Sequence, residues 1–558
     1  MNPSFTSKRS RSSIRMILPV VVLLTIITSI VAVSWRSPTQ AAATTVAPTS
    51  IEGRSEAERK QVFDYIVEKT MSRTAWSPYT PGRPDQNYPV QVMALWEEFR
   101  DAKTDAELYY TLIKISNLRH DRHLSVDTVE GGLVIEDTKL DQAPIQFRPD
   151  FGRSEPVFFV ADYDTRIASK WNQPMPSVGD TLRAVNGITI TSFVRQLEPY
   201  IRYSTERKLR WEIADSLAEK ELDDIDAKLF RDDVTYTLMR STGESYDLQL
   251  PYIEDEDITW AGTLEKKYTN FDPVLETKTY TLYVYQGDQK VILLDWVGFK
   301  DTLIADVDAL VKFAEANNLL DHDIIFDGTT SRGGSRGAYA LARLTDQSFK
   351  TTFGNLRISD IIPAFISDKE ADFAKGDIDN FDGGVELINW LRTDVQQAYD
   401  QGLDYAPAAP FKLADLPKSS EGIMQPAPVH FRGRMACFFS PKGGSHLDQF
   451  AAMVADNDLC HLIGMSAGGY SNTWEWEEVL KWPDGTPIVE YMWNIGHTIR
   501  PNGKILESNP ALPDELFPMT SDNFETYHDQ MIDRAFKHFY GNPAPSLYQI
   551  WIDSVFGR

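Results

Sequence analysis

The chain has 558 residues, of which 42% are hydrophobic and 25% are charged, and its formal net charge is −25. This length exceeds one ordinary domain, and the composition is that of a globular protein. The acidic excess argues against nucleic acid as a partner, because proteins that bind nucleic acid need basic surface. The two cysteines, Cys437 and Cys460, do not make a disulfide scaffold. Export would permit one disulfide between them, but both lie in apolar, strand-like segments, and we expect plain buried cysteines.

The N-terminal segment is typical of an export signal. A basic cluster within residues 8–15 precedes an apolar run at 16–33, and a stretch rich in Ala, Thr and Pro follows. Such a run is either a cleaved signal or a single transmembrane anchor. In both cases the basic flank stays in the cytoplasm and the rest is exported. We therefore assign 1–50 to a signal or membrane anchor plus linker, and expect a periplasmic or extracellular protein.

Helices and then strands are predicted along the first half of the exported chain. Residues 56–71 and 90–116 have apolar residues at helical spacing, and 117–126 is a polar turn entering a short strand. Strands and tight turns follow, with a long helix predicted over 192–217. We assign 51–150 to an N-terminal helical region that carries His123, and 151–255 to a β-rich domain.

From Val291 onward, apolar strands alternate with helices, which is typical of an α/β fold. Residues 353–428 interrupt this pattern. They are irregular and acidic, and we expect a surface insertion. The sequence therefore predicts an α/β core over 256–558.

Two glycine-rich turns of this core suit chemistry on a carbonyl group. In one, an apolar strand enters a Gly-Gly turn and Ser445 opens the next helix. In the other, a strand leads into a turn that contains Gly333 and Gly334. Backbone N–H groups at such turns stabilise an oxyanion, so Ser445 is a candidate nucleophile. The alternative is that Ser445 is a simple helix N-cap.

A nucleophilic serine needs a base. His446 adjoins it, but neighbours at the start of a helix point apart. No lysine occurs between Lys442 and Lys481. His120 and His123 lie in a polar turn, where histidine has less structural reason to occur than in a core, and we choose His123. A solvated loop histidine is the alternative, and the absence of any further ligand motif argues against a metal site.

Ser466 offers a rival nucleophile. The segment 464–468 reads Gly-Met-Ser-Ala-Gly, the spelling of a nucleophile elbow, and Asp514 and His528 follow in the order of an α/β-hydrolase. The residues after Ser466 are a weak start for a helix. An esterase of the α/β-hydrolase type that uses Ser466 is therefore a minor alternative.

Five segments, in chain order, resemble the tail-specific (C-terminal processing) serine proteases. Segment 121–124, Asp-Arg-His-Leu, resembles the Asp-Gly-His-Thr of the tricorn-like branch, and 178–187 resembles a PDZ signature. Segment 324–334 is similar to the strand that ends in Asp-Leu-Arg-Asn-Asn-Pro-Gly-Gly. Segment 445–450 resembles the nucleophile segment Ser-Ala-Ser-Glu-Ile-Phe, and 503–514 resembles a late segment with a supporting glutamate.

The resemblance implies a crotonase/ClpP-like α/β core with an inserted PDZ-like domain, and no cofactor. It implies a serine peptidase that acts on peptides or proteins. The implied roles are nucleophile for Ser445, base for His123, support for Glu507, oxyanion binding for Gly333, Gly334 and the amide of His446, and peptide docking for Val178, Gly179 and Asp180.

The sequence also departs from this family. The lysine that typical bacterial members place after the nucleophile is missing, and Thr329-Thr330-Ser331 replaces Arg-Asn-Asn. The first departure favours a Ser/His/Glu arrangement. It also motivates a second hypothesis, a non-catalytic protein that binds ligands or peptides on the same fold.

Overall fold

The computed structural model describes residues 51–75, 87–135, 141–378, 383–411, 421–471 and 474–542. These residues all belong to one compact unit, Ala42–Arg558, and the finer domain boundaries stay predictions. The expected signal or anchor at 1–50 lies outside the described residues. Within the described ranges, no helix is long and apolar enough to cross a membrane.

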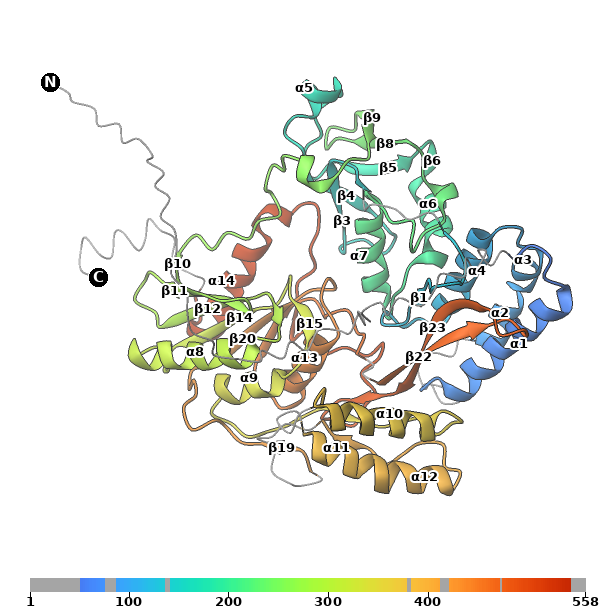
Figure 1. The fold of residues 1–558 in the computed structure, drawn as a ribbon. Helices are drawn as coiled ribbons and strands as arrows, with labels where there is room; N and C mark the ends of the chain where they lie inside the picture. The colour runs from blue at the N-terminus through green and yellow to red at the C-terminus, as the bar shows by residue number, and fades with distance from the viewer. Residues whose placement is uncertain are drawn as a thin grey trace, which may run out of the picture. The chain divides into compact units, whose positions relative to one another are not determined.

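A seven-stranded sheet forms the α/β core (Figure 1). Its order is β10-β11-β12-β14-β20-β21-β25, with antiparallel pairs from β10 to β12 and parallel pairs from β12 to β25. The strands are β10 Phe271–Glu276, β11 Tyr280–Tyr285, β12 Val291–Trp296, β14 Asp323–Asp327, β20 Met435–Phe439, β21 His461–Gly464 and β25 Glu515–Leu516. The helices are α8 Leu303–Ala316, α9 Gly337–Leu344, α13 His446–Asp456 and α14 Tyr527–Tyr540. The predicted mixed α/β fold is confirmed.

The central strands alternate between two apolar cores. On β12, Ile292 and Leu294 belong to the core that includes α8, α9 and α13, whereas Val291 and Leu293 belong to the core that includes α14. Strands that are buried on both faces read as continuous apolar runs. This is why the strands of the core were predictable from the sequence.

A second sheet occupies the region expected to be PDZ-like. Its order is β3-β4-β5-β8-β9, and β6 pairs with β5. The elements are β3 Ile145–Pro149, β4 Phe158–Tyr163, α5 Ile167–Trp171, β5 Thr181–Val185, β6 Ile188–Thr189, α6 Ile190–Leu197, α7 Glu206–Ser216, β8 Asp233–Met239 and β9 Ser245–Pro251. The long helix predicted over 192–217 is wrong, since a 3-10 turn that contains Pro199 separates α6 from α7.

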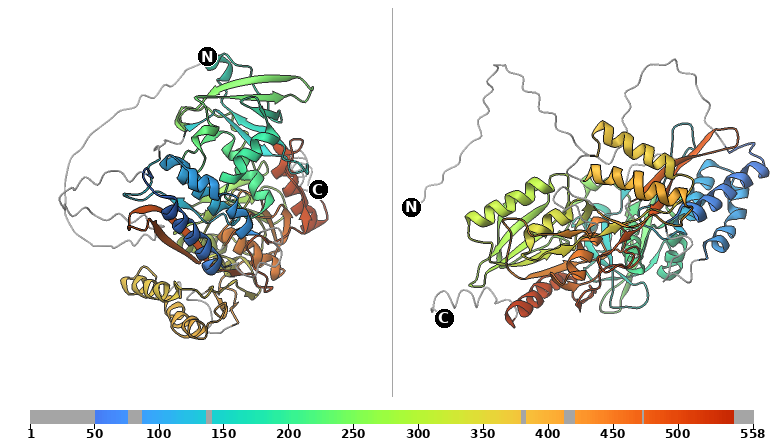
Figure 2. Two further views of the ribbon diagram at one scale, coloured as in Figure 1. Left: turned by 90° about the vertical axis from the view of Figure 1, so that its right-hand side faces the viewer. Right: turned by 90° about the horizontal axis from the view of Figure 1, so that it is seen from below.

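The N-terminal helices pack against a hairpin from the other end of the chain (Figure 2). The helices are α1 Glu56–Arg73, α2 Tyr88–Met93, α3 Trp96–Asp101 and α4 Asp105–Asn117, and the hairpin strands are β22 Trp474–Lys481 and β23 Pro487–Gly496. Strand β1, Val126–Asp127, pairs with β23. This pairing fixes the polar turn before β1, which carries His123, against the C-terminal part of the chain.

Residues 353–428 do not form the irregular surface insertion that we expected. They contain α10 Ile362–Lys375, α11 Gly384–Trp390 and α12 Gln396–Asp400. Buried side chains such as Phe365 and Leu391 join the same apolar core as the N-terminal helices. The acidic composition concealed these apolar positions.

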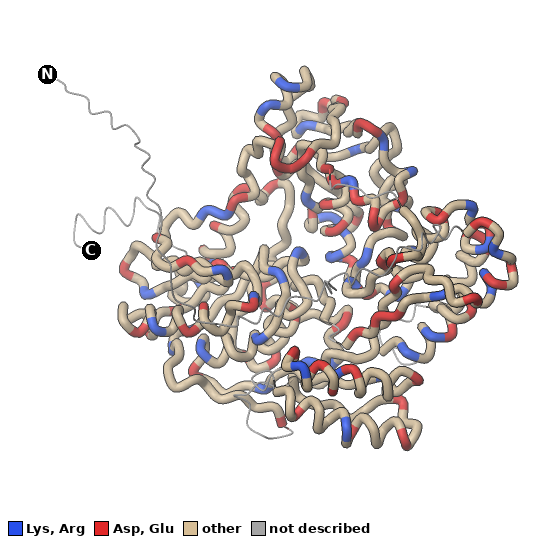
Figure 3. The backbone as a smooth tube through the Cα atoms, viewed as in Figure 1, with Lys and Arg blue, Asp and Glu red and all other residues tan. Residues whose placement is uncertain are grey.

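Short strand pairs complete the described structure. These are β2 Asp141–Gln142 with β7 Glu219–Lys220, β13 Gly298–Phe299 with β15 Arg332–Gly334, β16 Phe349–Lys350 with β19 Ile423–Met424, and β17 Phe353–Gly354 with β18 Ala409–Pro410 and β24 Thr498–Ile499. Figure 3 shows acidic and basic residues interspersed over the described chain, so the negative net charge is not confined to one segment.

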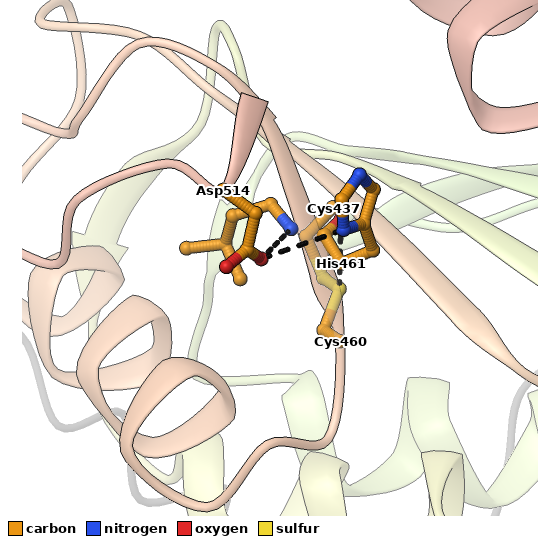
Figure 4. Close-up of a disulfide and its surroundings, with 5 residues drawn as sticks. Cys437, Cys460, His461 and Asp514 are labelled. Carbon is orange, nitrogen blue, oxygen red and sulfur yellow. Dashed lines mark hydrogen bonds and ion pairs between the residues drawn. A yellow bond between two sulfur atoms is a disulfide. The ribbon is translucent and has the colours of Figure 1, made fainter. Parts of the chain in front are cut away.

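The prediction of two separate buried cysteines is wrong. Cys437 on β20 and Cys460, just before β21, form a disulfide (Figure 4). The two strands are parallel neighbours, and this adjacency brings the Cα atoms to 6.2 Å. The bond closes the loop that contains Ser445 and α13.

Candidate active site

Ser445 ends the loop between β20 and α13. Its φ of 59° and ψ of −125° lie in a region that residues other than glycine rarely adopt. Its backbone N–H donates to the carbonyl of Tyr470 at 2.7 Å, and its own carbonyl accepts from Asp448 at 2.9 Å. Although Ser445 occupies the N-cap position, its side chain makes no capping hydrogen bond. The hydroxyl is therefore available for another partner.

That partner is His123. Its Nε2 lies 3.0 Å from Oγ of Ser445. Asp121 holds the histidine in place, because its Oδ1 accepts from the backbone N–H of His123 at 3.0 Å. The other oxygen of Asp121 accepts from Nδ2 of Asn494 on β23 at 2.7 Å. The hydrogen bonds of Asp121 thus link the histidine turn to the hairpin of β22 and β23. This link places His123 beside Ser445.

His120, the alternative base, lies elsewhere. Its ring packs edge-on against Tyr203, with centroids 4.7 Å apart, and it lines a cavity with residues of α4 and α6. Of the two histidines in the turn, His123 is the one hydrogen-bonded to Ser445.

The surroundings of His123 favour its neutral form. Burial lowers its pKa below the ordinary value, because an imidazolium loses solvation there. Nδ1 is buried, and no residue in the described ranges forms a hydrogen bond with it. Oε1 of Glu475, on β22, lies 3.8 Å away, and burial raises the pKa of Glu475 to about 8. Both groups are therefore mainly neutral at pH 7, and they do not yet form an ion pair.

Glu507 supports the segment next to the site. Its Oε2 accepts from the backbone N–H of Ser471 at 3.0 Å. Asp448, on the first turn of α13, accepts from the N–H groups of Gly469 and Tyr470 at 2.9 and 3.1 Å. Two carboxyl groups thus fix 469–471, whose Tyr470 carbonyl accepts from the amide of the serine, and burial raises the pKa of Asp448 to about 8.

Sequence reasoning missed Glu475. It lies on β22, where Trp474, Glu475, Trp476 and Glu477 form an alternating run that matches no catalytic motif. Only the pairing of β23 with β1 brings this region close to the histidine turn. No signal within the sequence could have identified it.

Gly333 lies directly against the serine. A Cβ at this position would approach Cβ of Ser445 to 2.6 Å and its Oγ to 3.0 Å, so only glycine fits. Gly334 has different surroundings, because it packs against the backbone of Phe299 and has a φ of 142°. Of the two glycines predicted for the oxyanion site, Gly333 is the one beside the nucleophile.

His446 contributes its backbone and its ring to different parts of the site. Its N–H is the first of α13, and such N–H groups have no acceptor within their own helix. Its ring accepts from the N–H of Gly337 at 2.6 Å, and burial lowers its pKa to about 4. The ring is thus a neutral acceptor that joins α13 to α9.

The residues of the rival site are not brought together. Ser466 is buried in irregular chain after β21, and no described residue forms a hydrogen bond with its hydroxyl. Asp514 lies 3.6 Å from Nδ1 of His461 (Figure 4), and Nε2 of His528 lies 3.1 Å from Oγ1 of Thr329. A nucleophile elbow needs a strand, a sharp turn and a helix. The α/β-hydrolase alternative therefore has no structural support.

Val178, Gly179 and Asp180 form the turn before β5. The N–H of Gly179 donates to the carbonyl of Val160 at 2.9 Å, and the buried carboxylate of Asp180 accepts from the Tyr246 hydroxyl at 2.6 Å. These contacts stabilise the sheet, which explains why Val178, Gly179 and Asp180 would occur here even without any role in binding. Peptide docking at this turn stays a prediction.

Two cavities adjoin the nucleophile loop. One, of about 440 Å³, is lined by Gly333, Gly443 and Tyr470, which flank Ser445. The other, of about 520 Å³, extends toward β3 and α14. The two share four lining residues, which are Asp215, Glu219, Arg332 and Lys442.

No family model and no curated protein matches the sequence. Solved structures do match. A point mutant of CPAF has a TM-score of 0.65 and 13% identity, with 88% of this chain and 99% of that chain covered. Mature CPAF complexed with lactacystin has a TM-score of 0.63 and 13% identity, with 87% and 98% covered. The similarity shows the fold of the CPAF serine proteases, at low sequence identity.

Proposed function

We propose that the protein is an exported serine peptidase that cleaves proteins or peptides, with Ser445 as nucleophile and His123 as base. The observation that carries this proposal is the 3.0 Å contact between Oγ of Ser445 and Nε2 of His123. A serine that served only as an N-cap would bond to an amide of its helix, and this one does not. Its rare backbone conformation is of the kind that concentrates at active sites.

The geometry supports the usual sequence of acyl transfer. Neutral His123 takes the proton as Oγ of Ser445 attacks the carbonyl carbon, which yields a tetrahedral intermediate with a negative oxygen. The amides of Gly333 and His446 stabilise that oxygen. The intermediate collapses as His123 protonates the leaving amine. Water, activated by His123, then hydrolyses the ester on Ser445.

His123 needs a partner at Nδ1 once it carries a charge. Glu475 stands 3.8 Å away, beyond hydrogen-bonding distance but close enough for a small shift to make the bond. When His123 takes the proton of Ser445, its positive charge lowers the pKa of Glu475. Glu475 then releases its own proton to solvent, and its carboxylate pairs with the Nδ1–H of the imidazolium. We therefore assign Glu475 the orientation of the imidazole, and Glu507 the support of the 469–471 segment.

The disulfide supports export. Disulfides persist in oxidising compartments and are rare in the cytosol. The bond between Cys437 and Cys460 therefore agrees with the signal or anchor expected at 1–50. If the apolar run is retained, the peptidase faces the periplasm or the exterior from the membrane surface.

One observation favours a second candidate function, a non-catalytic binding protein on the same fold. Nδ1 of His123 is buried without a hydrogen-bond partner among the described residues, so the triad is incomplete in the free protein. In a binding protein, ligands would occupy the cavities and no bond would break.

Labelling with a fluorophosphonate probe, followed by peptide mapping, separates the candidates. We expect an adduct on Ser445 that is lost in Ser445→Ala and strongly reduced in His123→Ala, while Ser466→Ala is labelled as the wild type is. An adduct on Ser466 would overturn the mechanism. No adduct on a protein with native circular dichroism would favour the binding protein.

A further inference from the structure

We propose that the cleft beside Ser445 selects its substrates by a carboxylate, which Lys442 and Arg332 bind. The inference rests on the proposed function, because it names a group on the substrate of the same site. The carboxylate belongs either to an Asp or Glu side chain near the scissile bond or to the C-terminus of the substrate.

The two cations lie on the loops that carry the catalytic groups. Lys442 shortly precedes Ser445, and Arg332 immediately precedes Gly333. Both line the 440 Å³ cavity and the 520 Å³ cavity, so they stand at the boundary between the two. A substrate whose scissile carbonyl lies between Ser445 and Gly333 therefore passes both cations.

The other cations that line the 440 Å³ cavity, and Arg148 of the 520 Å³ cavity, are paired with protein carboxylates, and Arg122 and Lys208 share one of them. Four pairs are present, namely Arg122 with Glu212 at 3.3 Å, Lys208 with Glu212 at 2.5 Å, Arg202 with Asp224 at 2.8 Å and Arg148 with Asp215 at 3.0 Å. Lys442 and Arg332 differ from them. Neither forms an ion pair with any residue in the described ranges, although Arg332 is exposed and Lys442 is only partly buried.

Glu219 and Glu221, which line the 440 Å³ cavity, do not fully neutralise the positive charges of Lys442 and Arg332. Burial, together with the neighbouring carboxylates, raises the pKa of Glu219 to about 8 and raises that of Glu221 as well. At neutral pH the two carboxyl groups therefore carry less than two negative charges. Positive charge remains unbalanced at Lys442 and Arg332.

A carboxylate is the ligand that this arrangement suits. Burial lowers the pKa of Lys442, and the positive charges of Arg148 and Arg332 lower it further, against the opposing charge of Asp215. Its ammonium is thus held in an unfavourable environment. An anion placed between Lys442 and Arg332 would restore the balance, and the guanidinium fork of arginine matches a carboxylate in shape. Among the groups that a peptide carries, only carboxylates are anionic at neutral pH.

The test uses the full-length protein and three peptides, of which the first and the second each differ from the third at one point. The first has Glu beside the cleaved bond and an amidated C-terminus. The second has Gln there and a free C-terminus close to the bond, and the third has Gln and an amidated C-terminus. We expect kcat/KM for one of the first two to exceed that of the third by about 10- to 100-fold, the range of charge-assisted hydrogen bonds. The peptide with the higher kcat/KM identifies the source of the carboxylate, either the Glu side chain or the C-terminus.

Variants assign that preference to the two cations. In Lys442→Met and Arg332→Gln the ratio of kcat/KM between the preferred peptide and the neutral peptide should fall toward one. Lys442→Arg should keep most of the preference, and Lys312→Met, an exposed lysine of α8, should match the wild type. A variant that loses the labelling of Ser445 as well as the preference would contradict a role in selectivity.

Three other outcomes would each contradict a different part of the proposal. Equal cleavage of all three peptides by the wild type would contradict the carboxylate preference and leave the peptidase intact. An unchanged ratio in both variants would assign the preference to other residues. Failure to cleave any peptide, together with no label on Ser445, would contradict the peptidase itself.

Discussion

The nucleophile and its base come from two regions that are built in different ways. Ser445 lies in the α/β core, where a parallel strand, a glycine turn and a helix follow one another within a short stretch of chain. His123 lies in a turn between α4 and β1, and the pairing of β1 with β23 holds that turn in place. The geometry of the serine is thus mainly local, whereas that of the histidine depends on β23, whose Asn494 is 373 positions away from its partner Asp121 in the histidine turn. Substitutions in the two regions should therefore affect catalysis and stability to different extents.

Removal of the base should have the largest effect. We expect His123→Ala to lower kcat by roughly 10³- to 10⁶-fold, because a triad acts as a unit. The variant should stay folded, since among the described residues the ring hydrogen-bonds to Ser445 alone and otherwise packs edge-on against Tyr470. Steady-state kinetics and circular dichroism measure the two properties.

His120→Ala is the matched control, because it removes a neighbouring histidine of the same turn. We expect its kcat to stay close to that of the wild type. If His120→Ala is as damaging as His123→Ala, the turn acts as a structural unit and the assignment of the base loses its support.

A comparison of Glu475 with Glu507 tests which of the two glutamates orients His123. We expect Glu475→Gln to lower kcat by roughly 10- to 100-fold, because it removes the charge that stabilises an imidazolium. Glu507→Gln should lower kcat less, since an amide oxygen can still accept the N–H of Ser471. Kinetics of both variants at pH 7 provide the measurement. The reverse order would assign the orientation of His123 to Glu507, as the family resemblance implies.

These cases also indicate what the sequence can predict. The strands and helices of the α/β core were predictable, because burial on both faces leaves continuous apolar runs such as 291–294 and 435–439. Ser445 was found as a candidate because its signal is local. The disulfide and Glu475 were missed, because each depends on which strands become neighbours. The helices α10 to α12 were missed because acidic residues interrupt the apolar positions of their segment and obscure the helical spacing.

Removal of the disulfide should perturb the region of Ser445 and leave the histidine turn unchanged. It closes the loop between β20 and β21, and no bond of this kind holds the histidine turn. Replacement of both cysteines by Ala should lower the free energy of unfolding by roughly 3 kcal/mol, as expected for a loop of this length. Denaturant titration measures this loss. Because β20 and α13 stay packed in the core, kcat at 25 °C should change little. A large loss of kcat with unchanged stability would mean that the bond positions Ser445 directly.

The pH dependence of activity should show the smallest effect, and it tests the histidine region alone. His123 acts as a base only when neutral, and burial holds its pKa below the ordinary value of 6.5. The acid limb of kcat/KM, which reports the free enzyme, should therefore lie below pH 6.5, and activity should fall as the pH drops through the lowered pKa. Arg202 contributes to this lowering, so Arg202→Gln should move the limb to higher pH. A limb above 6.5 in the wild type would mean that the imidazolium is already stabilised before substrate binds. In that case Glu475 would be ionised and paired with His123 in the free enzyme, and the imidazolium would not depend on the reaction to bring this partner to Nδ1.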